Sequence, residues 1–172
     1  MTRTVATPLV RRALGIGTAL AVGLALPVLV HLIPVQAGPP MGARLLPIFL
    51  AAAIAAMRLD AVSALSIAVL TPLLNQLLTG MPAGPMLPTV TIELLVVVSL
   101  VLAVRTWAPG ALRYVAAPAY LAGAVLAGAI VSGTGPATTL AFAASWSWPG
   151  LALLALVGAV LAPRRDASGS PS

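Results

Sequence analysis

The sequence predicts an all-α integral membrane protein, a single bundle of six transmembrane helices. Three observations lead to this prediction. Of the 172 residues, 60% are hydrophobic and only 7% are charged, and a soluble domain of this length does not hide so much apolar surface. The apolar residues fall into segments that meet or approach the length of about 20 residues that a membrane-spanning helix needs. The arginines gather in alternate connections between these segments, which gives the helices an orientation.

The second of the six segments is the weakest. It is short for a full span and contains Pro47, so we expect it either to begin earlier, near Met41, or to be partly shielded from lipid by its neighbours. A bundle of five spans is the alternative. The predicted spans are residues 13–33, 45–57, 61–79, 87–104, 112–131 and 138–162.

The N-terminal segment has two interpretations. Arg11-Arg12 before an apolar run, with Val35-Gln36-Ala37 after it, is typical of a signal peptide with a small-residue cleavage site. The apolar region of a signal peptide has about 15 residues at most, whereas this run is long enough to span a bilayer. We therefore expect a retained first helix. Cleavage would not invert the remaining helices, so the charge distribution does not decide between the two.

The basic residues are all arginines, and their positions predict that both termini are cytoplasmic. Short cytoplasmic loops are enriched in arginine and lysine. Only Arg44, between the first and second spans, falls on the other side, and the loops around residues 80–86 and 133–137 carry no charge. The arginines that share one side are Arg3, Arg11, Arg12, Arg58, Arg105, Arg113, Arg164 and Arg165.

The remaining charges fit this topology. We interpret Asp60 as a local counter-charge to Arg58 in a cytoplasmic turn. Residues 1–163 form the single transmembrane domain, and residues 164–172, rich in Ser and Pro, are predicted to be a disordered cytoplasmic tail. The formal charge of +6 points to anionic lipid headgroups rather than nucleic acid, because the arginines lie at segment ends and not on one soluble face.

Glu93 is the only acidic residue inside an apolar segment. An ionisable group in hydrocarbon costs several kcal/mol unless it faces a partner, a ligand or water, so it marks a functional site. It lies about 9 Å from the outer end of its helix at 1.5 Å per residue, a depth that is reachable from outside. Thr89, four residues earlier, shares its face. We predict that Glu93 contacts a ligand or ion, because Asn or Gln could join helices without a buried charge.

The third span carries polar residues at a similar depth. Thr71, Asn75 and Thr79 share one helical face, Gln76 is adjacent, and Pro72 frees a backbone carbonyl. Taken alone, Asn75 and Gln76 are expected to join helices by hydrogen bonds, as such amides commonly do. Near Glu93, both become candidate ligand contacts.

His31, Trp146 and Trp148 complete the candidate substrate-binding residues. A lone histidine near a helix end more often packs or bonds to a carbonyl than binds metal, so we expect no metal site; a proton-responsive pair with Glu93 is the alternative. Trp146 and Trp148 would lie near the middle of the sixth span, although tryptophan usually collects at membrane interfaces. They either fill the core or form a flat wall for an aromatic or heterocyclic ligand.

Small residues recur in the first span. Gly17, Ala21 and Ala25 stand at steps of four, which makes a flat stripe that another helix can approach closely. This stripe either packs inside the bundle or docks a separate membrane subunit.

The composition argues against an enzyme and predicts no cofactor. The chain has no Cys and no Lys, which excludes thiol catalysis, a Walker A sequence and Schiff-base chemistry. One His and three acidic residues provide neither a metalloprotease pair nor a carboxylate dyad within the membrane. No nucleophile-elbow sequence is present.

Six spans with cytoplasmic ends, a small-residue stripe in the first helix and charge-free outer loops rich in Pro and Gly resemble the substrate-binding (S) component of energy-coupling factor transporters. The closest likeness covers about a third of the chain and includes Leu74-Asn75-Gln76 and Ile92-Glu93-Leu94. It runs over residues 42–47, 71–82, 85–88 and 92–94.

This resemblance implies a function in the bacterial cytoplasmic (inner) membrane. A pocket near the outer face would bind a vitamin or a vitamin precursor for ATP-driven uptake. The resemblance also implies a separate membrane-coupling subunit, docked on Gly17, Ala21 and Ala25, and two ATPase subunits. The alternative is a non-transporting membrane scaffold or assembly subunit whose polar residues only join helices.

Overall fold

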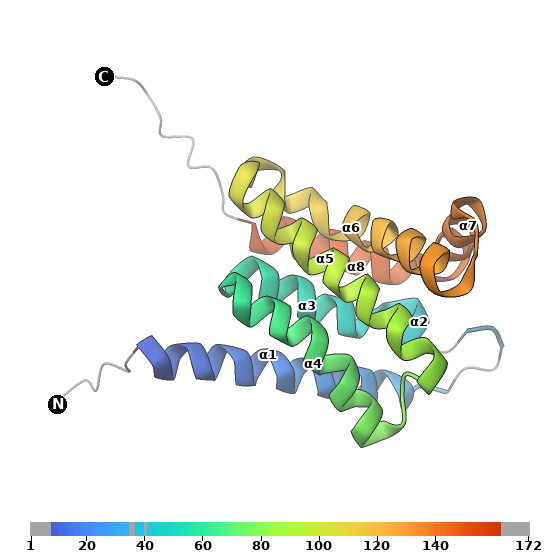
Figure 1. The fold of residues 1–172 in the computed structure, drawn as a ribbon, viewed down its shortest axis with the longest axis horizontal. Coiled ribbons are helices and arrows are strands. Elements are labelled where there is room, and N and C mark those ends of the chain that lie inside the picture. The colour runs from blue at the N-terminus through green and yellow to red at the C-terminus, as the bar shows by residue number, and fades with distance from the viewer. Residues whose placement is uncertain (1–7, 35–36, 40, 163–172) are drawn as a thin grey trace.

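The computed structural model describes residues 8–34, 37–39 and 41–162. Most of the helices that these residues form pack along a common direction, with short connections (Figure 1). Five helices are long and apolar enough to cross a membrane, or six if one bent pair counts as a single span. The predicted all-α, multi-pass membrane bundle is confirmed in this form. The predicted tail, residues 164–172, and Val35 and Gln36 of the cleavage motif lie outside the described residues.

Four helices correspond closely to predicted spans. They are α1 (Pro8–His31), α4 (Ala61–Thr79), α5 (Leu87–Trp107) and α6 (Leu112–Ala127). Short 3-10 turns, η1 (Gly84–Met86) and η2 (Pro109–Ala111), precede α5 and α6. Helix α6 continues directly into a π-helical turn, η3 (Gly128–Ser132).

The bounds of α4 follow from its flanking residues. Asp60 precedes the helix, and its side chain accepts a hydrogen bond from the backbone N–H of Ser63, as an N-cap does. Gly80 follows the helix with φ 73°, in the left-handed conformation that terminates many helices. The predicted range 61–79 is therefore confirmed at both ends.

The second predicted span is long enough to cross the membrane, but it consists of two helices. These are α2 (Met41–Leu45) and α3 (Pro47–Arg58), separated by Leu46 with φ 51°. A residue before proline is disfavoured in the right-handed helical region, which explains the break at this position. Together the two helices form a candidate span that begins at Met41, and half of it is buried, the largest share of any span. The early start and the shielding, which the sequence offered as alternatives, both occur.

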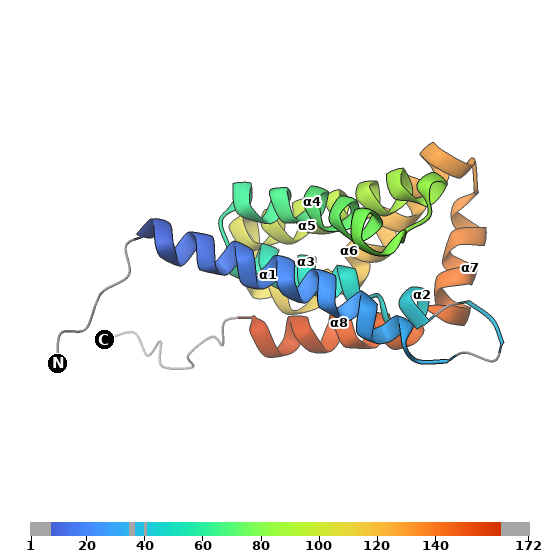
Figure 2. The same cartoon turned by 90° about the horizontal axis from the view of Figure 1, so that it is seen from below.

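The sixth predicted span differs from the expected continuous helix over residues 138–162. It is divided into α7 (Pro136–Trp146) and α8 (Trp148–Leu161), which are bent by 83° at Ser147. Pro149 lies in the first turn of α8, a position that favours the start of a new helix. Figure 2 shows α7 turned across the end of the bundle where α2 lies. The two tryptophans therefore flank a bend and do not lie within a continuous span.

The buried core lies between α3, α5, α6 and α8, and α1 packs along the outside against α3 and α4 (Figures 1 and 2). The start of α1 and the end of α8 lie at the same end of the bundle. Arg12, Arg58, Arg105 and Arg113 are on helix termini at this end. We refer to it as the arginine end.

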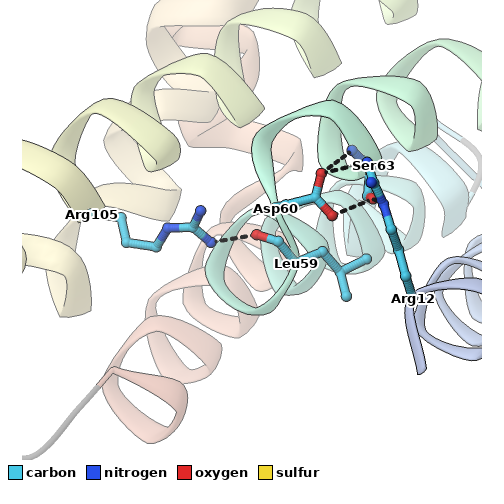
Figure 3. Close-up of polar contacts among 5 residues, drawn as sticks. All are labelled: Arg12, Leu59, Asp60, Ser63 and Arg105. Atoms are coloured by element: carbon cyan, nitrogen blue, oxygen red, sulfur yellow. Dashed lines mark hydrogen bonds and ion pairs between the residues drawn. The ribbon is translucent and has the colours of Figure 1, made fainter. Parts of the chain in front are cut away.

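Polar contacts join the helices at the arginine end (Figure 3). The Arg12 guanidinium lies 2.9 Å from a carboxylate oxygen of Asp60. Asp60 was predicted to balance Arg58, and that assignment is wrong, because its carboxylate pairs with Arg12 and caps α4. Arg105 donates hydrogen bonds of 2.7 and 2.6 Å to the carbonyls of Ala56 and Leu59, at the C-terminus of α3.

Candidate ligand-binding cavity

A cavity of about 480 Å³ lies at the end of the bundle opposite the arginine end. Its lining combines the last residues of α1 and α4 with the first residues of α3 and α5, together with side chains from α2, α6 and α7. Most of the lining is apolar. Small-molecule sites have this size and this combination of an apolar wall with a few polar groups.

The structure brings four of the predicted site residues to this cavity. Glu93 and Thr89 come from α5, Asn75 from α4 and His31 from α1. Their residue numbers run from 31 to 93, so the cavity exists only because the helices pack as they do.

Gln76, Trp146 and Trp148 are not among the residues that line the cavity. Trp146 lies under the guanidinium of Arg44, 5.2 Å from its ring centroid. Trp148 is 63% exposed at the start of α8, where no neighbouring element covers most of its ring. The bend at Ser147 explains these positions, because it moves both tryptophans from the expected middle of a span to the end of one.

Glu93 is the only carboxylate that lines the cavity. Within the described part of the chain the only ion pair joins Arg12 and Asp60, so Glu93 has no cationic partner there. Its backbone is in close contact with α6, since a Cβ on Gly123 would lie 2.9 Å from the carbonyl oxygen of Glu93. A glycine on the neighbouring helix therefore permits the close approach of α5 and α6 that sets the position of this carboxylate.

Asn75 has a structural partner as well as a place in the cavity wall. Pro27 lies inside α1 and has no backbone N–H, so the carbonyl of Gly23, four residues earlier, lacks its usual donor in the helix. The Nδ2 of buried Asn75 donates to that carbonyl at 3.2 Å. The hydrogen bond between helices, which the sequence favoured for Asn75, is present.

His31 is held at the mouth of the cavity by its own helix. Its Nδ1 lies 2.6 Å from the carbonyl oxygen of Pro27. A carbonyl only accepts, so Nδ1 is the donor and carries the proton. This bond to a carbonyl is the ordinary role that the sequence favoured for a lone histidine. It leaves Nε2 as the ring nitrogen that is free of this contact.

The aromatic wall of the cavity comes from residues that sequence reasoning missed. Phe49 and Tyr120 pack edge to face, with ring centroids 4.9 Å apart and planes at 74°, and Phe142 of α7 also lines the cavity. Tyr120 is only 6% exposed. One signal could have singled it out, since a phenol in the middle of an apolar span is as unusual as the two tryptophans.

No protein-family model, curated protein or solved structure matches the chain. Among the residues that the structure describes, no three His, Cys, Asp or Glu side chains are grouped so that they could hold a metal ion. The candidate site consists of the Glu93 carboxylate, the Asn75 amide and the His31 imidazole in a cavity with aromatic and aliphatic walls.

The small-residue stripe of α1 faces away from the bundle. Gly17, Ala21 and Ala25 are exposed, and no atom lies within 4 Å of a Cβ placed on Gly17. The packed face of α1 instead includes Gly23, whose added Cβ would lie 2.9 Å from Cγ2 of Thr71. Of the two roles that the sequence left open for the stripe, packing inside this bundle is not the one observed.

Proposed function

We propose that this multi-pass membrane protein is the substrate-specificity subunit of an uptake transporter, and that its cavity binds a vitamin-like small molecule. The observation that carries the proposal is the Glu93 carboxylate, which lines a cavity of about 480 Å³ with no cationic partner among the described residues. A carboxylate in an apolar membrane interior needs a compensating group. A ligand with a cationic or hydrogen-bond-donating group supplies one.

The roles of the lining residues follow from their positions. Glu93 binds the cationic or donor group, Asn75 and Thr89 orient the ligand, and the rings of Phe49 and Tyr120 contact its apolar body. His31 lies at the mouth, where it meets the ligand on entry. Gln76, Trp146 and Trp148 lie outside the lining, and we assign them no direct ligand contact.

The arginine distribution supports an outward-facing cavity. Connections rich in arginine are retained on the cytoplasmic side, and Arg12, Arg58, Arg105 and Arg113 all lie at the end of the bundle opposite the cavity. In this orientation both termini are cytoplasmic, and the ligand enters from outside a bacterial cytoplasmic membrane. The protein acts as a carrier and not as an enzyme.

Energy for uptake would come from separate subunits. The exposed stripe of Gly17, Ala21 and Ala25 offers α1 a surface that a helix of a membrane-coupling subunit can approach closely. ATPase subunits would bind to that coupling subunit on the cytoplasmic side. The resemblance to energy-coupling factor S components supports this division of labour.

The test is to identify the small molecules that the gently purified protein retains, by mass spectrometry, in the wild type and in Glu93→Gln. We expect Glu93→Gln to reduce the retained solute about tenfold or more, the effect of losing a charge-assisted hydrogen bond of about 1.5–3 kcal/mol, with an unchanged melting temperature. Thr91→Val is the matched control, because Thr91 is on the same helix, is absent from the cavity lining and bonds only to the carbonyl of Leu87.

Two results would count against the proposal. Equal retention of solute by the wild type and Glu93→Gln would show that Glu93 does not contribute to solute binding. Copurification of other membrane proteins with no solute and no ATPase-containing complex would favour the scaffold function instead.

A further inference from the structure

A second cavity, a groove, is open along the side of the bundle between α1 and α3. It has a volume of about 350 Å³. Leu14, Ala19 and Val22 of α1 and Ala51 and Ile54 of α3 contribute to its lining, which is apolar except for Thr18 and Arg58. From Leu14 to Val22 the groove follows α1 for about 12 Å at 1.5 Å per residue. It therefore extends from the arginine end toward the middle of the bilayer.

Arg58 is the charged group of this groove. It is the last residue of α3 and is exposed at the arginine end. Two other arginines at this end are engaged, since Arg12 pairs with Asp60 and Arg105 bonds to the carbonyls of Ala56 and Leu59. Among the described residues, Asp60 is the only acidic side chain at this end, and Arg12 occupies it. Arg58 is therefore a cation that is available to an anion from outside the chain.

We propose that this groove binds one anionic phospholipid, with an acyl chain between α1 and α3 and the headgroup phosphate on Arg58. An apolar groove that ends in a cation at the level of the headgroups matches the order of groups along a phospholipid. Basic pockets between transmembrane helices bind anionic headgroups in this way. The site is at the opposite end of the bundle from the ligand cavity, so this proposal does not depend on the transport function.

The experiment is native mass spectrometry of the full chain in detergent, with added phosphatidylglycerol or phosphatidylcholine of identical acyl chains. We expect the wild type to retain phosphatidylglycerol preferentially. Arg58→Gln should weaken its retention about fivefold, which corresponds to the loss of about 1 kcal/mol per arginine near an anionic headgroup. Arg113→Gln removes the same charge from the same end, on α6 and outside the groove, and should leave retention unchanged.

A second pair of variants tests the acyl-chain part of the groove. Ala19→Phe adds bulk within the groove and should reduce the retention of both lipids. Ala122→Phe adds the same bulk to an exposed position on α6, and lipid retention should be unaffected.

The proposal is overturned if phosphatidylglycerol and phosphatidylcholine are retained equally, or if Arg58→Gln behaves like Arg113→Gln. It is also overturned if a copurifying polypeptide displaces the lipid and cross-links through position 19, since the groove would then be a protein-docking surface. A loss of solute from the ligand cavity in Glu93→Gln leaves the result of the lipid experiment unchanged, which keeps the two proposals separately testable.

Discussion

Gly123 of α6 lies directly against the backbone of Glu93 in α5. A Cβ on Gly123 would be 2.9 Å from the Glu93 carbonyl oxygen and 3.2 Å from its Cα. A backbone cannot move aside as the end of a long side chain can. The position of the only carboxylate in the cavity therefore depends on a residue that has no side chain.

Gly123→Ala should separate α5 and α6 at the level of Glu93. We expect a loss of about 1–3 kcal/mol in the free energy of unfolding, the usual cost of overpacking, together with reduced retention of solute. Thermal unfolding and mass spectrometry of the purified variant measure the two effects. Gly17→Ala is the control for stability, because a Cβ there meets no atom within 4 Å. Wild-type behaviour of Gly123→Ala would show that this glycine does not set the helix spacing.

Asn75 and Pro27 should be energetically coupled. Asn75→Leu leaves the carbonyl of Gly23 without a donor, and we expect it to cost about 1–3 kcal/mol of stability. Pro27→Ala restores a backbone N–H that can bond to the same carbonyl, so Asn75→Leu should cost much less in that background. Melting temperatures of the wild type, the two single variants and the double variant give the coupling energy. Additive effects would mean that the hydrogen bond contributes little.

Asp60 should make the stability depend on pH in the acid range. The hydrogen bond from the Ser63 hydroxyl, the Ser63 backbone N–H and the charge of Arg12 lower the pKa of Asp60 below its ordinary value. A lowered pKa in the folded state stabilises above the unfolded-state pKa, about 4, and this stabilisation is lost as the pH falls through the folded pKa. The wild type should therefore melt higher than Asp60→Asn at pH 6, and the difference should shrink below about pH 4. A difference that is constant with pH would show that the charge is not responsible.

Arg44 should fix the connection between α1 and α2, next to the cavity residues Gly42 and Ala43. Its guanidinium donates hydrogen bonds to the carbonyls of Ala37 and Pro39 and stacks over Trp146 at 5.2 Å. Arg44→Gln loses the stacking, worth about 1 kcal/mol, so bound solute should leave about fivefold faster. Release after dilution, followed by mass spectrometry, measures the rate. Arg113→Gln, distant from the cavity, should release solute at the wild-type rate; equal rates for all three proteins would remove Arg44 from this role.

The sequence predicted the bounds of α4 and one polar residue of the cavity. The apolar segment 61–79 matches the helix that Asp60 and Gly80 cap, and Glu93 pointed to the cavity because a charge in an apolar segment is costly wherever it lies. The partner of Asp60 was not predictable, because Arg58 is closer in sequence and only the packing of α1 against α4 brings Arg12 within 2.9 Å.

The bend at Ser147 and the aromatic wall show the limit of reading segments by hydropathy. Residues 138–162 carry no charge and are mostly apolar, and hydropathy alone does not distinguish one helix from two helices at 83°. Pro149 was the local signal for a new helix start. Phe49 and Phe142 are ordinary apolar residues in their own segments, and they acquire a role only because the packed helices place both in the lining of the cavity.

The bend has a mechanical consequence. The Ser147 hydroxyl donates a hydrogen bond to the carbonyl of Ala43 at 2.9 Å, so the bend between α7 and α8 is bonded to α2. Helix α2 itself ends at a break, because Leu46 between α2 and α3 has a left-handed backbone conformation. Two interrupted helices from distant parts of the chain are thus joined beside the cavity. Separating α7 from α2 would break both this hydrogen bond and the stacking of Arg44 on Trp146.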